Sequence, residues 1–159
     1  MRCFISMLAL LVALPAGAAG VIGQNELPIH DAARNGDAAS VERLLGADPS
    51  FRDTPTAAGS TPLHLAAMNG DPGPLKVLLA AGARIDARDN EGATPLHMAA
   101  YASRTENGRL LLQAGADPLI KTDLGRDVLS MARKVRADEL AGVISLWMLK
   151  GCKPGKASC

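Results

Sequence analysis

The chain has 159 residues, enough for one domain of ordinary size, and a formal net charge of +1 from 17 basic and 16 acidic residues. Without a clustered basic face, this balance argues against a nucleic-acid partner. Apolar residues make up 48% of the chain but aromatic residues only 3%, which favours thin, closely stacked helices over a sandwich built around aromatic side chains. No apolar run reaches the length of about 18 residues that a transmembrane helix needs, so no stable membrane insertion is expected.

Residues 1–18 have the pattern of a cleaved signal peptide. Arg2 supplies a positive charge, an almost unbroken apolar stretch follows to Leu14, and small residues after Pro15 suit a signal peptidase. A buried N-terminal helix is the alternative, which Pro15 and the nearby glycines disfavour. We expect cleavage after Ala18 or after Gly20 and predict a periplasmic location in a bacterium. Removal of residues 1–18 leaves 16 basic and 16 acidic residues.

A short motif returns along the chain at a nearly fixed period in the low thirties. Residues 61–67 read TPLHLAA, residues 94–100 read TPLHMAA, and looser copies lie at 27–33 and 127–133. A T-P-L-H-x-A motif at this period resembles the ankyrin-repeat family. The resemblance covers about residues 25–150 and is most specific at the two central copies, whose motif residues are Thr61, Pro62, His64, Thr94, Pro95 and His97.

The resemblance implies an all-α solenoid of four helix-turn-helix repeats with finger-like turns between them. The ankyrin-repeat domain would span residues 19–151 and leave residues 152–159 as a C-terminal tail. The repeats themselves would lie at about residues 26–53, 59–89, 92–122 and 125–150. The last repeat keeps the spacing but loses most of the motif, as terminal repeats of such arrays commonly do.

Repeats two and three differ where the first helix ends. Asn69 and Gly70 predict a glycine in the left-handed conformation at the end of the helix in repeat two. In repeat three Ser103 replaces that glycine, and residues 103–106 predict a capping box for the second helix. Gly108 then lies within that helix, where glycine weakens a helix by up to about 1 kcal/mol relative to alanine.

Two cysteines remain after removal of the predicted signal peptide. Cys152 and Cys159 lie near the end of the chain, on either side of Pro154 and Gly155, and predict a disulfide in an oxidising compartment. Two free thiols or an intermolecular bridge are the alternatives. No second Cys or His pair lies near them, so a zinc site is not expected.

The sequence contains few features that would indicate an enzyme. His30, His64 and His97 occupy the same place in successive repeats, where the resemblance implies backbone hydrogen bonds that tie neighbouring turns together. Motifs of the kinds G-x-S-x-G and G-x-x-x-x-G-K are missing, and the acidic pairs lie in turns. We therefore expect no catalytic residue, no metal and no cofactor.

A protein-binding surface is what remains. In proteins similar to this one, the finger tips and the exposed side of each first helix line a concave groove. Tyr101 is the best single candidate, since Tyr and Arg dominate interface energetics; the alternative is a Tyr that fills a gap beside the second helix of repeat three. Position by position, the predicted partner-binding residues are Arg34, Asn35, Met68, Asn69, Asn90, Glu91, Tyr101, Arg126 and Lys134.

The sequence thus predicts a monomeric, non-enzymatic protein–protein interaction module in the periplasm. It would bind a partner protein and inhibit or protect it, for example as an immunity protein to a toxin or as an accessory to an oxidative-stress enzyme. A structural adaptor in a cell-envelope assembly is the alternative, because the fold alone does not specify the partner.

Overall fold

The computed structural model describes residues 26–152. Residues 1–25 and 153–159 lie outside the described part of the chain, and the predicted signal peptide, residues 1–18, lies there with them. In the described range, every helix is too short or too polar to cross a lipid bilayer.

The predicted disulfide reaches the edge of the described range. Cys152 is its last residue and is disulfide-bonded. Cys3 and Cys159, the two other cysteines of the chain, both lie outside that range. The pairing of Cys152 with Cys159 therefore stays a prediction.

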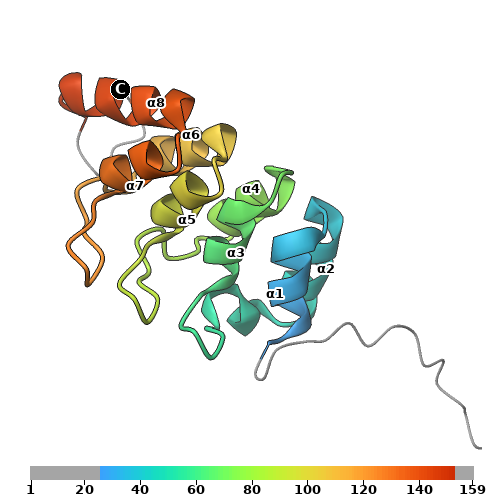
Figure 1. Ribbon diagram of the computed structural model, residues 1–159. Helices are drawn as coiled ribbons and strands as arrows, with labels where there is room; N and C mark the ends of the chain where they lie inside the picture. The colour runs from blue at the N-terminus through green and yellow to red at the C-terminus, as the bar shows by residue number, and fades with distance from the viewer. Residues whose placement is uncertain (1–25, 153–159) are drawn as a thin grey trace, which may run out of the picture.

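The described chain is an array of helix pairs, which confirms the prediction of an all-α solenoid of four repeats. Figure 1 shows the pairs stacked side by side, with the long turns between them projecting on one side. The first helix of each pair packs on the first helix of the next. The helices are α1 (Pro28–Asn35), α2 (Ala38–Ala47), the short 3-10 helix η1 (Pro49–Asp53), α3 (Pro62–Met68), α4 (Gly73–Ala80), α5 (Pro95–Tyr101), α6 (Thr105–Gln113), α7 (Val128–Lys134) and α8 (Asp138–Leu149).

The second helices form a less regular row than the first helices. Helix α2 packs on α4, and α6 packs on α8, but the backbones of α4 and α6 approach each other less closely. The start of α6 lies against α3. The outer row is therefore less evenly spaced between repeats two and three.

Each first helix begins in a similar way. Pro28, Pro62 and Pro95 occupy the first helical turn of α1, α3 and α5, and the residue before each proline is extended. Proline fits there because the first N–H of a helix has no partner within the helix. In α7 this place belongs to Val128, and the carboxylate of Asp127 accepts a hydrogen bond from the Ser130 N–H at 2.7 Å.

Leucine and alanine side chains fill the core between the two rows. Six leucines of the two central repeats are fully buried: Leu63, Leu75, Leu78, Leu96, Leu111 and Leu112. Each such side chain contributes about 1.5–3 kcal/mol of burial free energy. Fully buried alanines alternate with them in the first helices, and because alanine ends at Cβ these helices can stack closely: Ala33, Ala66, Ala67, Ala99 and Ala100.

The expectation for the turn inside repeat two is wrong. Gly70 is not left-handed, because the Asn69 side chain accepts the Asp71 N–H at 3.0 Å and holds that turn. Ser103 adopts the left-handed conformation instead, with φ 54°. It belongs to a Schellman motif in which the N–H groups of Ser103 and Arg104 bond Ala100 O and Ala99 O.

The predicted capping box at the start of α6 is also wrong. The helix begins at Thr105, and Arg104 precedes it without a capping hydrogen bond from its side chain. The Arg104 guanidinium instead donates from Nε to Met68 O, at 3.0 Å, in the preceding repeat. The side chain of the residue before α6 thus contacts the preceding repeat and does not cap the helix.

Candidate functional site

Three finger-like turns repeat the same hydrogen bonds in successive repeats. Each is closed at its base by one backbone bond, from Thr56 to Ser60, from Asp89 to Ala93 and from Thr122 to Arg126, all at 2.9 Å. Glycines with φ between 71° and 77° lie at the tips, at positions 59, 92 and 125. The left-handed conformation suits glycine, so the fingers share one geometry.

Neighbouring fingers are hydrogen-bonded to each other. The Asn90 N–H donates to Ala58 O, and its side-chain amide donates to Ala57 O, both at 3.0 Å. A Cβ on Gly59 would lie only 2.5 Å from the Asn90 Oδ1. Glycine is therefore required there for close approach as well as for its φ angle.

The second and third fingers are joined in the same manner. The Asp123 N–H donates to Glu91 O at 3.0 Å, one repeat on from the bond between Asn90 and Ala58. Arg88 adds an ion pair to Asp123, also at 3.0 Å, on the exposed surface. The fingers thus form a connected edge that holds backbone and side chains at a regular spacing.

The three histidines lie between the first helices and the fingers and are fully buried. The Nδ1 of His64 accepts the Thr61 N–H at 3.1 Å, which assigns the ring proton to Nε2. Nε2 then donates to Ala93 O in the next finger, at 3.1 Å. His30 and His97 make the equivalent contacts to Thr54 O, at 2.7 Å, and to Arg126 O, at 3.3 Å.

The environment of His64 and His97 favours the neutral imidazole. Burial lowers the pKa of His64 and of His97 below the ordinary value of 6.5, although hydrogen bonds to carbonyl oxygens act in the opposite direction. Their nitrogens are occupied by backbone partners. These imidazoles therefore join neighbouring repeats and are not available to a substrate.

A groove with a volume of about 340 Å³ lies between the first helices and the second and third fingers. Its floor is apolar and rich in methionine, with one residue from α3, two from α5 and one from α7: Met68, Met98, Tyr101 and Met131. The fingers supply its walls, which are Glu91, Ala93, Thr122, Leu124 and Arg126. Glu91 and Arg126 are exposed and place one charge of each sign at the rim. We call this hollow the methionine groove.

Four of the predicted partner-binding residues line the methionine groove: Met68, Glu91, Tyr101 and Arg126. Tyr101 has 61% of its surface exposed, so its ring does not fill a gap in the core. Met98 and Met131 escaped the sequence-based prediction, since a methionine inside a short helix reads as core. Their spacing of one full repeat was the signal that could have placed them on the same face.

The other predicted residues lie outside the groove lining. Asn69 and Asn90 use their side-chain amides to hold backbone carbonyls of the preceding repeat. Arg34 forms an ion pair with Glu26 at 2.7 Å, and Asn35 donates to Asp31 at 3.0 Å. Lys134 is exposed at the end of α7.

The described part of the chain holds no group of three or more His, Cys, Asp or Glu side chains that could bind a metal ion. Burial raises the pKa of Asp86, but its carboxylate accepts the Asp117 N–H at 3.1 Å and acts as a link between turns. The arrangement can therefore present a surface, and the methionine groove is a hollow in it.

Comparison with known proteins agrees with this geometry. A family model described as ankyrin repeats, in three copies, matches residues 29–122, which is more than half of the chain. No curated protein matches the chain significantly.

Proposed function

Because the chain belongs to the ankyrin-repeat family, we propose that it binds one partner protein in the methionine groove. Members of this family are protein–protein interaction modules and are typically not enzymes. The observation that carries this proposal is the apolar floor of that groove, open to solvent between two fingers. An apolar centre with a polar rim is the usual composition of a specific protein interface.

The side chains of the groove suit an inserted apolar residue of the partner. Methionine is unbranched and polarizable, so three methionines can adapt to the shape of what enters. Tyr101 offers a large aromatic surface together with a hydroxyl group, a combination enriched at energetically dominant interface positions. Glu91 and Arg126 at the rim would set orientation and exclude partners of the wrong charge pattern.

We place this binding in a bacterial periplasm, where the chain would inhibit or protect its partner. Support for export comes from the charged, apolar and small-residue pattern of residues 1–18. An immunity protein that neutralises a toxin and an accessory to an oxidative-stress enzyme both need a single tight partner. N-terminal mass analysis of the protein from fractionated cells tests the export step directly.

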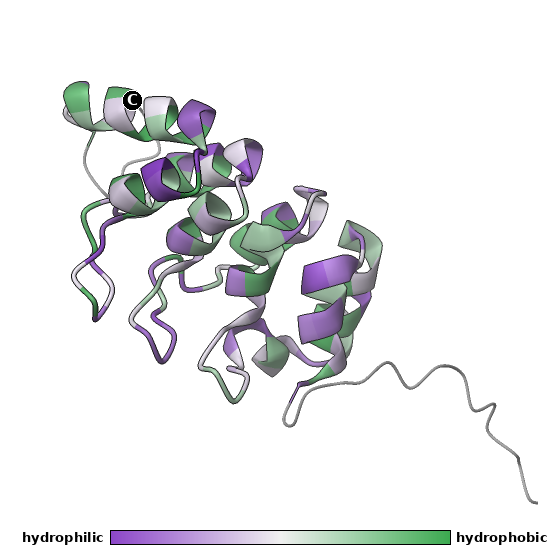
Figure 2. Ribbon diagram, in the orientation of Figure 1, coloured by the Kyte–Doolittle hydropathy of each residue, from purple (hydrophilic) through white to green (hydrophobic). Residues whose placement is uncertain are grey.

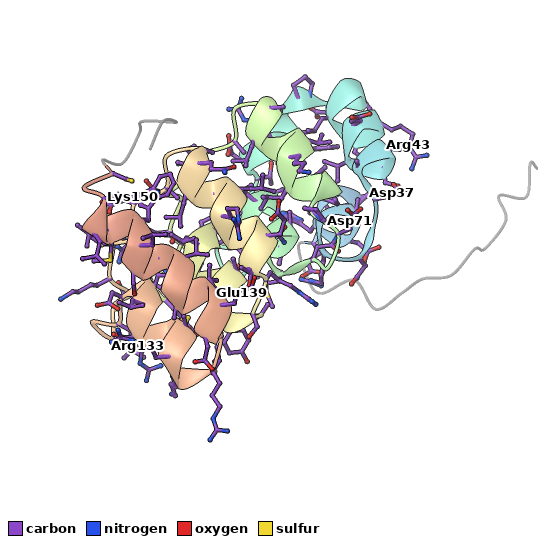
Figure 3. The ribbon with its side chains drawn as sticks, turned by 90° about the horizontal axis from the view of Figure 1, so that it is seen from above. Asp37, Arg43, Asp71, Arg133, Glu139 and Lys150 are labelled. Carbon is purple, nitrogen blue, oxygen red and sulfur yellow. The ribbon has the colours of Figure 1, made fainter. Side chains whose placement is uncertain are left out.

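The central experiment is affinity purification of the tagged protein from its own host, with mass spectrometry of the proteins that come with it. Tyr101→Ala and Arg126→Ala alter the groove, whereas Arg43→Ala removes an exposed arginine from the outer helix α2, where Figure 3 shows it pointing away from the array. We expect one stoichiometric partner, bound at least about tenfold more weakly by Tyr101→Ala and unaffected by Arg43→Ala.

Other outcomes separate the alternatives. Several weak partners from the cell envelope, retained equally by all variants, would favour the structural adaptor. A single partner whose affinity ignores Tyr101 and Arg126 but responds to changes on the outer helices would disprove the groove as the binding site.

A further inference from the structure

Charge is distributed unevenly over the fingers and first helices of the array. The finger and first helix of repeat two, residues 55–70, contain no charged side chain, and those of repeat three, residues 88–103, contain one basic and two acidic residues. In repeat four, residues 121–136 contain five basic and two acidic residues, a formal charge of +3. Figure 2 shows a hydrophilic stretch in α7, the first helix of that repeat. Repeat four is therefore the basic end of this row.

Two of the cations of repeat four lie beside the methionine groove. Arg126 lines the groove, and Lys134 follows Met131 by three residues, on the same side of α7. Lys134 also holds the position in α7 that Tyr101 holds in α5, one repeat earlier. Both cations are exposed. The groove therefore has an apolar centre and a basic flank along α7.

The basic flank has no carboxylate of its own. Arg34, which holds the place of Lys134 in repeat one, is paired with Glu26 at 2.7 Å. Among residues 26–152, neither the Arg126 guanidinium nor the Lys134 ammonium forms such an ion pair. Asp127, the acidic residue next to Arg126, uses its carboxylate to cap α7. A bound partner can therefore supply the carboxylates that these two cations lack.

The acidic residue of the groove gives the site a direction. Glu91 lines the groove from the second finger and is exposed, whereas Arg126 and Lys134 belong to repeat four. A bound segment that carries carboxylates is repelled by Glu91 and attracted to the flank along α7. Its acidic residues therefore point towards repeat four.

We propose that the partner presents an acidic segment to the methionine groove. One large apolar side chain of that segment enters between the second and third fingers, and carboxylates of neighbouring residues bind the Arg126 guanidinium and the Lys134 ammonium. A guanidinium holds a carboxylate through two parallel hydrogen bonds, which adds direction to the attraction. This inference rests on the proposed function and adds the chemistry of the partner to it.

Other occupants match the groove less well. A basic segment is repelled along α7, and the phosphates of a nucleic acid are repelled by Glu91 and gain nothing from the apolar floor. A second copy offers the exposed Leu124 beside Asp123, but Asp123 is already paired with Arg88, and Leu124 is part of the groove wall itself. An acidic segment with an apolar residue matches both the floor and the flank.

The test selects peptides without presupposing their charge. A displayed library of random peptides of about twelve residues is selected on the immobilised, folded full chain, and the strongest binder is then measured by fluorescence anisotropy. We expect the selected peptides to carry Leu, Phe or Met with Asp or Glu within about four positions, more often than an unselected sample of the same library. Circular dichroism confirms that each variant of the chain is folded.

Arg126→Glu combined with Lys134→Glu is the variant that tests the basic flank. Its matched control is Arg43→Glu combined with Lys76→Glu, which makes the same change of charge at exposed positions on the outer helices α2 and α4. We expect the strongest peptide to bind the first variant about tenfold more weakly or worse and the control within about twofold of wild type.

The peptide supplies a second control. Replacement of its Asp and Glu residues by Asn and Gln should weaken binding to wild type about fivefold or more and should change binding to the variant of the flank much less. A high salt concentration should also weaken binding to wild type, because the paired charges are exposed.

Tyr101→Ala separates this inference from the proposed function. Peptides that need Tyr101 but show no preference for acidic residues, or that bind the variant of the flank as well as wild type, would disprove the acidic segment and leave the groove as the binding site. Peptides that ignore Tyr101 would disprove both. Failure to select any peptide would also overturn the acidic segment, and a dimer in sedimentation velocity that the variant of the flank dissociates would assign the groove to a second copy.

Discussion

The junction between repeats one and two and the junction between repeats two and three meet the same need with different residues. The last carbonyl oxygens of a helix have no partner within that helix. At the end of α1, the side-chain amide of Asn69 donates to Ala33 O and Gly36 O, both at 3.1 Å. Asn69 comes from the end of α3, the next first helix along the array.

At the end of α3, three carbonyl oxygens accept a donor from outside the helix end, those of Ala66, Ala67 and Asn69. The residue in the place of Asn69 one repeat on is Ala102, which has no amide. Asn107 in the first turn of α6 donates to these oxygens instead, at 3.2, 3.1 and 2.9 Å. The end of this first helix is therefore capped from a different helix.

This exchange explains the irregular outer row. Asn107 and Arg104 both bond the end of α3, and they hold the start of α6 against α3, while the backbones of α4 and α6 approach each other less closely. Where Asn69 does the capping, α2 and α4 are free to pack together. The comparison teaches that each of these two helix ends needs a donor for its carbonyl oxygens. Which residue supplies that donor, and from which helix, can differ between junctions.

The largest expected effect is on the second junction. Asn107→Ala should lower the free energy of unfolding by about 3 kcal/mol, because Ala67 O and Asn69 O lose their Asn107 donor in a place where Asn107 is only 2% exposed, while Ala66 O keeps the Asn69 N–H. Asn69→Ala should cost about 1.5 kcal/mol, since that side chain is only partly buried. Urea unfolding followed by circular dichroism measures both.

Two further variants show whether capping is the reason. Asn35→Ala is the matched control: Asn35 lies one repeat before Asn69 but bonds only to the neighbouring Asp31, so the change should stay within about 0.5 kcal/mol. Ala102→Asn, introduced into Asn107→Ala, should recover about 1 kcal/mol by restoring the arrangement of the first junction. If it recovers no stability, an asparagine at position 102 cannot cap the end of α3 as Asn69 caps the end of α1.

The histidine ties respond to pH, whereas the asparagine caps do not. Burial lowers the pKa of His64 and His97 in the folded chain below 6.5, so the unfolded chain binds protons at a higher pH than the folded chain. Their stabilising contribution is complete above about pH 7. It falls as the pH drops through 6.5 towards the folded pKa, by at most about 1.4 kcal/mol per pH unit for each histidine.

Urea unfolding at intervals from mildly alkaline to mildly acidic pH checks this dependence. Wild type should lose stability over that range, and His64→Gln should show a shallower slope although it is less stable throughout. Asn107→Ala should be displaced by a constant amount at every pH, because the amide does not titrate. A slope that His64→Gln leaves unchanged would locate the pH dependence in other groups.

The repeat architecture was predictable because its signal is redundant. The motif around Pro62 and His64 recurs at one period, and each copy specifies a helix start and a tie to the next finger. Part of the groove was predictable for the same reason: Met68 and Tyr101 hold equivalent positions in successive repeats. Contacts between repeats, such as those of Asn107, carry no local pattern and could not be predicted.

Gly108 shows the limit of local reasoning most clearly. Read within its own helix, this glycine predicts only a weakening of α6. In the structure a Cβ at this position would lie 2.5 Å from a methyl group of Leu140, which is fully buried in α8. The glycine is there to let α8 approach, a requirement set by a residue in the following repeat.

Substitutions in the turns after α3 and α5 should have the smallest effects on stability. In these turns the glycine is not left-handed and the serine is. Gly70 does not use the left-handed conformation, and a Cβ there would meet nothing nearer than the Arg104 Nη1 at 3.8 Å. Gly70→Ala should therefore stabilise the fold by about 0.5 kcal/mol, because alanine lowers the conformational entropy of the unfolded chain. Ser103, at φ 54°, bears the strain that glycine would relieve.

Ser103→Gly should therefore also stabilise the fold by about 0.5 kcal/mol, because relief of the left-handed strain exceeds the added entropy of the unfolded chain. Ser103→Ala keeps the strain and serves as the control, with no gain expected. Thermal unfolding resolves shifts of this size, at a few degrees per kcal/mol in a chain of this length. If Gly70→Ala lowered the stability of the fold while Ser103→Gly raised it, the Asn69 side chain would not be what holds the turn after α3. A left-handed residue would then be needed in both turns, and Asn69 would serve only to cap the end of α1.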